Sequence, residues 1–436
     1  MDETTADGFD AVETHLNNND ARAAAAAIQA VAGYPRPLQE PSDWQRLGQL
    51  LGRLAGDEAP ELRRQGERLA ADPGDLQVLY DIGYQLFEVG LFGVAATVLT
   101  RAEELTPGVP AIISELVSAF EEMGLYDHAV ELLQRHPHLA QQQLLFAYLL
   151  AFNGMLSGRP EIARAQTQRL TAASDDNERF MVARITRMLA RVDHFQGRTA
   201  LDRQDLRGWH LVLTGGVLLH LSSAGFDDGM NGRYAFLQDS LSRIQAGIVA
   251  LDELLTATGQ TPAQILLLPE RGSEAVGLAA AARLGLPTAQ YSPDAKGLVV
   301  AYDLEHLPFG VLRALRDHQP DQLLWAHALC WTDPPPICPD IVTLMYQHNI
   351  TPWQPQLTMT PEGESERAPA VTGTAEAIAA ALIAAPPLED DARPNQRPSL
   401  WAAIRDAPTD AKIGIFRQEA LRERLWYMGP VKSNRF

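Results

Sequence analysis

Residues 76–107 read LQVLYDIGYQLFEVGLFGVAATVLTRAEELTP, and this stretch decides the fold of the first half of the chain. Apolar and small residues recur at helical spacing on both sides of Gly90, which predicts two helices joined by a turn. Gly90 permits a backbone turn that a β-carbon would hinder, and Pro107 stops the second helix. The two helices face one another through Leu79, Ile82, Gly83, Leu86, Ala95, Leu99 and Ala102.

The same residue types return along the chain at a fixed interval. Gly90, Gly124 and Gly158 are 34 residues apart, and Ala95, Ala129 and Ala163 repeat that interval in phase. This is the length of a tetratricopeptide repeat, and about residues 41–175 resemble that family. Helix pairs within 8–32 and 43–71 are predicted as earlier units, and a helix over 177–196 is predicted to cap the array. A plain helical bundle with accidental phasing is the alternative.

The resemblance implies a right-handed stack of antiparallel helix pairs that forms a helical domain over residues 1–200. Such a stack curves into a concave surface, which holds a peptide or another protein. His136 departs from the family pattern because it stands where a small residue is usual. The repeats contain no residues with evident catalytic chemistry, so a protein or peptide partner on the repeat surface is the predicted ligand.

A different pattern begins at Trp209, where short apolar runs replace the helical periodicity. Gly215-Gly216, between two such runs, predicts a hairpin, and a helix is predicted over about 233–258. Strands then alternate with helices, which implies a mostly parallel sheet covered on both faces, in an α/β domain over 205–353. The predicted strands are 210–214, 217–222, 265–268, 288–291, 298–302 and 323–329, and the later helices are 273–284 and 309–317.

One segment of this half has the pattern of an anion site. Residues 265–274 read ILLLPERGSE, which predicts a strand, a tight loop and a helix with Ser273 as its N-cap. Free backbone N–H groups at such a helix start attract anions. Two glutamates, Glu270 and Glu274, flank the loop and would oppose an anion. The candidate anion ligands are Arg271, Gly272 and Ser273.

The order of elements over about 209–332 resembles a type I phosphoribosyltransferase. In that family a strand and a pyrophosphate loop precede a helix, which ends here in LGLP at 284–287. A later strand of the family ends in two acidic residues before a phosphate loop rich in hydroxyl groups and glycine. Residues 298–310, LVVAYDLEHLPFG, occupy the equivalent place. The resemblance implies a phosphoribosyl diphosphate site to which Asp303 contributes.

The chain departs from this family at the residues that would hold the ligand. Tyr302 stands at the first acidic position, so only Asp303 matches the acidic pair. Leu307 and Pro308 occupy the phosphate loop, where they offer few donors, because proline has no N–H. Two interpretations stay open: a degenerate, inactive relative, or a different, Rossmann-like α/β fold with a similar order of elements.

The loop at 222–233, SSAGFDDGMNGR, is the second candidate site of this half. It follows a predicted strand and so lies at a sheet edge, where ligands often bind. Asp227, Asp228 and Arg233 are candidates for contact with a ligand. An ordinary loop shaped by Asx turns is the alternative.

The bulk composition limits the partners. The chain has 436 residues and a formal net charge of −19, which disfavours binding to nucleic acid or an anionic membrane. Cys330 and Cys338 are the only cysteines, so a disulfide framework is excluded and a reducing cytoplasm is predicted. With His327 they are too few for a usual zinc site, so neither a metal nor a cofactor is predicted. No apolar run is long enough to cross a membrane.

The last part of the chain differs in composition from the rest. Residues 354–400 are rich in proline, alanine, threonine and glutamate, which is typical of a linker or a loosely packed extension. Residues 401–436 are predicted to form a basic helical tail. From Ala411 onward six basic residues stand against two acidic ones, with Trp426 and Tyr427 among them. Such a tail docks either on the protein's own surface or on a partner.

Two functions of different classes fit these patterns. The first is a protein-interaction scaffold whose repeats hold a partner, joined to an α/β domain without an intact phosphoribosyl diphosphate motif. The second is an enzyme or sensor that binds a nucleotide or another phosphorylated small molecule at the sheet edge. The missing phosphate loop favours the scaffold, and whether the chain is an enzyme stays open.

Overall fold

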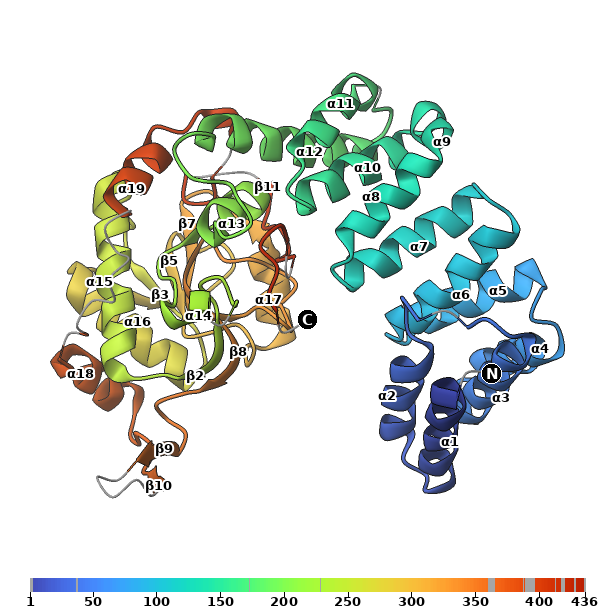
Figure 1. The fold of residues 1–436 in the computed structure, drawn as a ribbon. Coiled ribbons are helices and arrows are strands. Elements are labelled where there is room, and N and C mark those ends of the chain that lie inside the picture. Colours follow the sequence, from blue (N-terminus) through green and yellow to red (C-terminus); the bar gives the residue numbers. More distant parts are fainter. Residues whose placement is uncertain are drawn as a thin grey trace. The chain divides into compact units, whose positions relative to one another are not determined.

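The computed structural model describes residues 3–36, 38–171, 173–227, 229–359, 365–386, 388, 397–411, 413–416, 420–426 and 429–434. Contacts divide the chain into two compact units, residues 1–182 and 183–436. We call the first the repeat array and the second the α/β unit (Figure 1).

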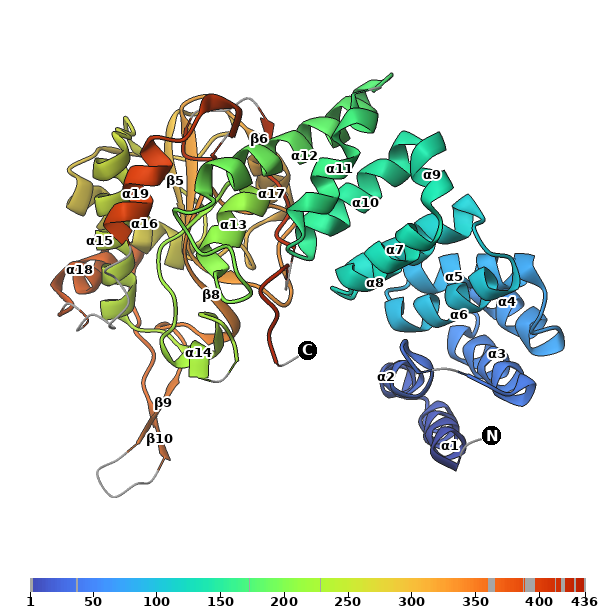
Figure 2. The same cartoon turned by 45° about the horizontal axis from the view of Figure 1, so that its top comes forward.

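The repeat array consists of short helices that pack in consecutive pairs, as the two views in Figures 1 and 2 show. Close neighbours include α3 with α4, α5 with α6, and α10 with α11. The helices are α1 (Glu3–Asn17), α2 (Ala21–Ala32), α3 (Pro41–Ala55), α4 (Pro60–Ala71), α5 (Leu76–Glu88), α6 (Phe92–Leu105), α7 (Pro110–Glu122), α8 (Tyr126–Arg135), α9 (Pro137–Gln142), α10 (Leu144–Leu156), α11 (Pro160–Leu170) and α12 (Asp176–Phe195), the last of which crosses the boundary between the units. The predicted tetratricopeptide-like helical array is confirmed.

The repeated glycines lie where the periodicity predicts turns. Gly90, Gly124 and Gly158 have φ angles of +79°, +67° and +74°, a backbone region that a β-carbon disfavours. Gly83 serves close packing instead, because a β-carbon there would lie 2.6 Å from Cγ of Leu99 on the paired helix. The 34-residue interval therefore reflects both the turns and the helix contacts.

The departure at His136 is compensated by a buried polar pair. Its Nε2 lies 2.7 Å from Oε1 of Glu103, which belongs to the preceding repeat. Both side chains are nearly buried. A larger residue is tolerated here because its ring nitrogen bonds a buried carboxylate, whose other oxygen lies 3.8 Å from the Arg135 guanidinium.

The α/β unit is built on a seven-stranded sheet in which every pairing is parallel. Its order is β1-β8-β7-β5-β3-β4, and β2 also pairs with β8. The strands are β1 (Val217–Leu218), β2 (Tyr234–Gln238), β3 (Ile265–Leu267), β4 (Thr288–Gln290), β5 (Gly297–Ala301), β7 (Gln322–Cys330) and β8 (Ile341–Ile350). The predicted parallel α/β architecture is confirmed.

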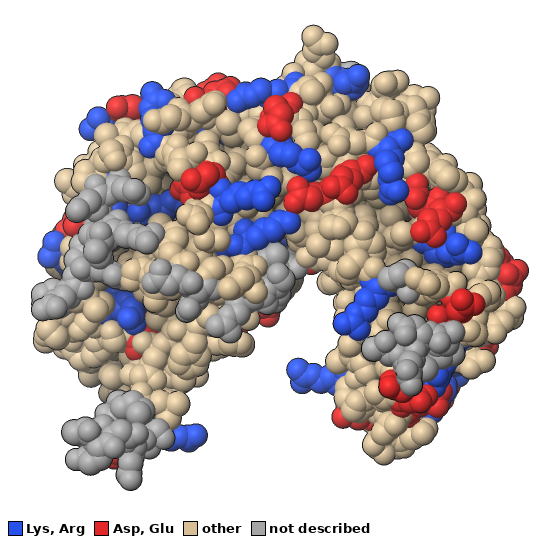
Figure 3. Space-filling view, viewed as in Figure 1, with Lys and Arg blue, Asp and Glu red and all other residues tan. Residues whose placement is uncertain are grey.

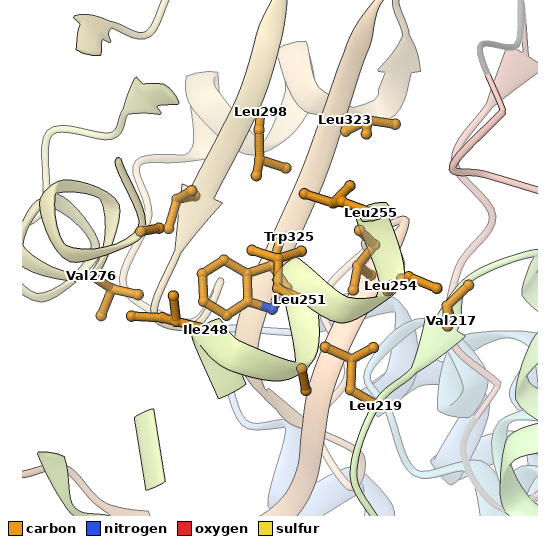
Figure 4. Packing of buried hydrophobic residues seen from close by; sticks show 14 of the residues in the cluster. Val217, Leu219, Ile248, Leu251, Leu254, Leu255, Val276, Leu298, Leu323 and Trp325 are labelled. Carbon is orange, nitrogen blue, oxygen red and sulfur yellow. The ribbon is translucent and has the colours of Figure 1, made fainter. Parts of the chain in front are cut away.

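Alternate residues of the central strands face opposite sides of this sheet. One set packs under α15 (Leu241–Thr258), α16 (Arg271–Leu284), α18 (Ala375–Ala384) and α19 (Arg397–Arg405). Figure 4 shows this cluster around Trp325, with Leu298 and Leu323 beside it. The other set packs with α17 (Phe309–Arg316). The first set includes Ile265, Leu267, Leu298, Val300, Leu323 and Trp325, and the second includes Leu266, Val299, Ala301, Leu324 and Ala326.

The predicted hairpin at Gly215-Gly216 is wrong. Residues before it form helix α13 (Leu206–Thr214), whose N-cap Asp205 accepts a hydrogen bond from the backbone N–H of Gly208. Gly215 ends the helix in the left-handed region, with a φ angle of +77°. The glycine pair therefore terminates a helix, and only β1 remains of the second predicted hairpin strand.

Two further elements differ from the prediction. Residues 234–238, predicted as the start of a helix, form the edge strand β2, and α15 begins only after the N-cap Ser240. Strand β8 was not predicted, although it joins β1 and β2 to the sheet. Its second half, YQHNI, is polar and only partly buried, which conceals the strand pattern in the sequence.

The linker interpretation of residues 354–400 also needs correction. This stretch contains a two-stranded sheet of β9 (Gln356–Met359) and β10 (Ser365–Ala368), and then α18. Ile378 and Leu382 of α18 are fully buried against the core. Alanine-rich composition here reflects close helix packing, since α18 lies against α16.

The described part of the basic tail docks on the α/β unit and is mostly not helical. After α19 and a short 3-10 turn, Ala420–Leu421 (β11) pairs antiparallel with Asp317–His318 (β6). Arg422 is buried and forms a bidentate ion pair with Asp340, with a shortest N–O distance of 2.8 Å. The predicted self-docking alternative therefore describes this part of the tail. Among the described residues, no helix combines the length and apolar character needed to cross a membrane.

Candidate functional site

The predicted anion loop after β3 is occupied by the protein's own carboxylate. Helix α16 begins at Arg271, and its N-cap is Glu270 rather than Ser273. The Glu270 carboxylate accepts the backbone N–H groups of Gly272 and Ser273 at 2.7 and 2.6 Å. Two of the backbone donors that would attract an external anion are therefore already satisfied, and Glu270 takes the N-cap position predicted for Ser273.

The three candidate residues of this loop have separate environments. Arg271 is exposed. Gly272 packs under Trp353, because a β-carbon at this position would lie 2.4 Å from the indole ring. Ser273 is buried, and its hydroxyl accepts the backbone N–H of Tyr302 at 3.0 Å. Only Arg271 is available to a ligand, whereas Gly272 and Ser273 hold the loop in place.

Tyr302, directly after β5, belongs to a buried hydrogen-bond network that the sequence did not reveal. Its hydroxyl donates to Oδ2 of Asp239 at 2.8 Å and accepts from the Asn349 side chain at 2.8 Å. Nε2 of His327 lies 3.1 Å from the same Asp239 oxygen. Burial acts to raise the pKa of Asp239, but the charge and hydrogen bond of His327 outweigh it, and the pKa lies below its usual value. Asp239 is therefore a buried carboxylate whose charge is compensated.

Asp303 follows Tyr302 in the chain, and its pKa is shifted in the opposite direction to that of Asp239. The loops after β3 and β5 share one sheet edge because the two strands are parallel neighbours, as predicted. Burial raises the pKa of Asp303 to about 6, and the charges of Glu305 and Glu270 add to the rise against that of His306. A carboxyl group with such a pKa can exchange protons near neutrality. The same negative surroundings oppose a diphosphate ligand.

The segment at the expected phosphate loop is filled by apolar contacts. Leu307 is buried in the core cluster on the α17 face of the sheet. Pro308 precedes α17 and caps it without a side-chain hydrogen bond. This part of the sheet edge thus has the shape of a packed loop rather than of a cradle of N–H donors.

The candidate residues of the second loop, at 222–233, have different surroundings. Asp228 lies outside the described residues, and the side chain of Asp227, at the end of α14 (Ala224–Asp227), is not described. Arg233 is buried and donates to the backbone oxygens of Met230 and Val431 at 3.3 and 2.8 Å. Its described hydrogen-bond acceptors therefore belong to its own loop and the C-terminal tail.

The cysteine and histidine cluster does not assemble. His327 is bound to Asp239, whereas Sγ of Cys338 lies 3.8 Å from Nε2 of His210. Both cysteines are free thiols. Within the described residues, no group of three or more histidine, cysteine or acidic side chains is placed to hold a metal ion.

A groove in the repeat array is a further candidate site that the sequence did not locate. It has a volume of about 500 Å³ and lies between α6, α7 and α8, with the loop after α2 forming a further wall. The backbone N–H of Tyr34 in that loop donates to the carbonyl of Gly93 on α6 at 2.9 Å, which fixes the loop there. The groove is lined by Tyr34, Thr100, Leu116, Phe120, His128 and Leu132, with Glu131, Gln134 and Arg135 at its rim.

The floor of the groove is aromatic and its edges are polar. Tyr34 contacts Phe120 edge-on, with ring centroids 4.9 Å apart, and His128 at 5.5 Å. Oγ1 of Thr100 is buried and lacks a hydrogen-bond partner among the described residues. Apolar walls with a few unsatisfied polar groups are typical of a site that receives a side chain together with its backbone. Basic and acidic side chains are interspersed on the face shown in Figure 3.

No protein family and no curated protein matches the chain. Solved structures named MamA AMB-1 are similar to part of it. One is 18% identical with a TM-score of 0.24 and covers 38% of this chain and 95% of its own. Another is 19% identical with a TM-score of 0.24 and covers 41% and 97%. Likeness at this TM-score carries no weight for the function.

Proposed function

We propose that the chain is a protein-interaction scaffold whose repeat array binds an extended segment of a partner protein in the groove beside Tyr34 and His128. The groove between α6, α7 and α8 is the observation that supports this proposal. Its volume of about 500 Å³ suits one or two side chains with their backbone. Thr100 lines the groove, and its buried hydroxyl has no hydrogen-bond partner among the described residues.

The surroundings suggest an apolar anchor in the bound segment. Phe120 and Leu116 are almost fully buried yet line the groove, so an inserted apolar side chain would remove their last exposed surface from water. Glu88 and Glu115 lie on α5 and α7, the first helices of two successive repeats. Burial and the charge of Glu88 raise the pKa of Glu115. These acids disfavour a partner that presents a carboxylate, such as a free C-terminus.

The α/β unit completes the proposed scaffold without transferase chemistry. Its loop after β3 is capped by Glu270, and the expected phosphate loop packs through Leu307. A degenerate phosphoribosyltransferase-like body remains our proposal for its ancestry. A cytoplasmic location is also proposed, supported by the two free thiols.

A displayed peptide library selected on the full chain tests the groove. We expect enriched peptides to share one apolar anchor, and Thr100→Arg, which fills the groove, to weaken their binding at least tenfold. Thr171→Arg is the matched control, because Thr171 is exposed at the end of α11 and lies outside the groove. Equal loss in both variants, or unchanged binding in Thr100→Arg, would refute the groove as the site.

A further inference from the structure

A second, smaller cavity lies in the α/β unit, between α13 and the C-terminal tail. Its volume of about 30 Å³ holds about two water molecules, or a group of their combined size. One face of α13 forms a wall at helical spacing, through Leu206, Trp209, His210 and Leu213. The opposite wall comes from Trp331, directly after β7, from Met345 in the middle of β8, and from tail residues that include Trp426 and Val431.

Arg233 brings a positive charge to this cavity, and no described acidic side chain pairs with it. Only two of its five N–H groups donate to described atoms, both of them backbone oxygens. Its Nε is buried with no hydrogen-bond partner, and no salt bridge to Arg233 occurs among the described residues. The guanidinium lies 4.8 Å above the ring of Trp331, which supports one of its faces. Burial lowers the pKa of Arg233 to about 9, so it stays cationic at neutral pH.

His210 contributes a second unsatisfied group to the same cavity. It is almost fully buried, and its Nδ1 has no hydrogen-bond partner among the described residues. Burial, together with the charge of Arg233, lowers the pKa of His210 to about 3, so the ring is neutral. A neutral imidazole offers one donor and one acceptor, and its other nitrogen faces the thiol of Cys338.

We infer that this cavity binds a small carboxylate of about the size of acetate, with its oxygens on the Arg233 guanidinium. Two carboxylate oxygens match the planar fork of an arginine side chain. The volume of two waters accommodates the carboxylate and a methyl group, which would contact the tryptophan walls. The apolar walls favour such an anion over a phosphate, because a phosphate brings more oxygens than the cavity offers donors for. This site is independent of the proposed groove in the repeat array.

Ligand-observed NMR on the full chain tests this site with acetate, acetamide and pivalate. We expect acetate to bind saturably, with a Kd between about 0.1 and 10 mM. Acetamide has the same shape without the charge, and pivalate has the charge but exceeds the volume. Both are expected to bind at least tenfold more weakly than acetate. Equal binding of acetate and acetamide, or no saturation by acetate, would show that the cavity holds only water and would overturn the proposal.

Two variants locate the binding to Arg233. Arg233→Gln is expected to abolish saturable acetate binding. Arg424→Gln is the charge-matched control, since Arg424 stacks on Trp426 at 4.6 Å but does not line the cavity. We expect this control to change the affinity by less than about threefold, as for a partly screened charge. Retained acetate binding in Arg233→Gln would overturn the assignment, and the three-ligand comparison decides the matter if that variant fails to fold.

Discussion

At the scale of single residues, burial decides the protonation of the acids near the sheet edge. Asp239 keeps its charge because His327 and the Tyr302 hydroxyl compensate it. Asp303 lacks such partners and faces other carboxylates, so its pKa rises to about 6. The surroundings of these two aspartates therefore shift their pKa values in opposite directions.

This difference predicts a pH-dependent effect of Asp303→Asn. The pKa of Asp303 is raised from 3.8 to about 6, so the stability that it contributes is present below about pH 3.8 and lost as the pH rises through 6. Asparagine resembles the protonated form and keeps the oxygen that accepts the backbone N–H of Glu305. We expect the free energy of unfolding to rise by about 1–3 kcal/mol at pH 8 and to change little at pH 4.

Urea unfolding followed by tryptophan fluorescence measures this effect, because six of the seven tryptophans lie in the α/β unit. Asp294→Asn, at an exposed position, is the control and is expected to change the stability by less than about 0.5 kcal/mol. A destabilised Asp303→Asn at pH 8 would contradict the assigned environment of this carboxyl group.

At the scale of elements, the sequence predicts what repeats or alternates and misses what depends on distant partners. The helices of the array follow from the 34-residue interval, and β3, β5 and β7 follow from their apolar runs. Helix α13 resembled a strand because its last turn, His210–Thr214, is apolar and precedes two glycines. The local sequence offers no signal for the Asp239 site, since His327 lies 88 residues away.

Helix α18 was not predicted, because its alanine-rich sequence lies in a stretch typical of a linker. Two substitutions test whether this helix belongs to the core. Leu382 is fully buried in the core, whereas its neighbour Ile383 is 51% exposed. We expect Leu382→Ala to lower the free energy of unfolding of the α/β unit by about 2–4 kcal/mol. Ile383→Ala is expected to cost less than about 1 kcal/mol, and the same urea titration compares them. Equal small effects would mean that α18 does not belong to the core.

At the scale of the whole molecule, we propose that the α/β unit is a degenerate phosphoribosyltransferase-like body that has lost the contacts needed to hold its ligand. We expect calorimetry to show no saturable binding of phosphoribosyl diphosphate in the presence of magnesium. Each missing charge-assisted contact forfeits about 1.5–3 kcal/mol, and the pyrophosphate loop is already capped by Glu270. Micromolar binding that disappears in Asp303→Ala would restore the enzyme interpretation.

The central claim is that the groove of the repeat array holds a partner segment. Photo-crosslinking from a benzophenone amino acid at position 128 in the full chain, added to an extract of its own cells, tests it most directly. The same group at position 138, which is exposed on α9 outside the groove, is the reference. We predict one discrete crosslinked protein from position 128, absent from position 138 and lost when Thr100→Arg fills the groove. Crosslinks that are the same from both positions, or that persist with Thr100→Arg, would contradict the account.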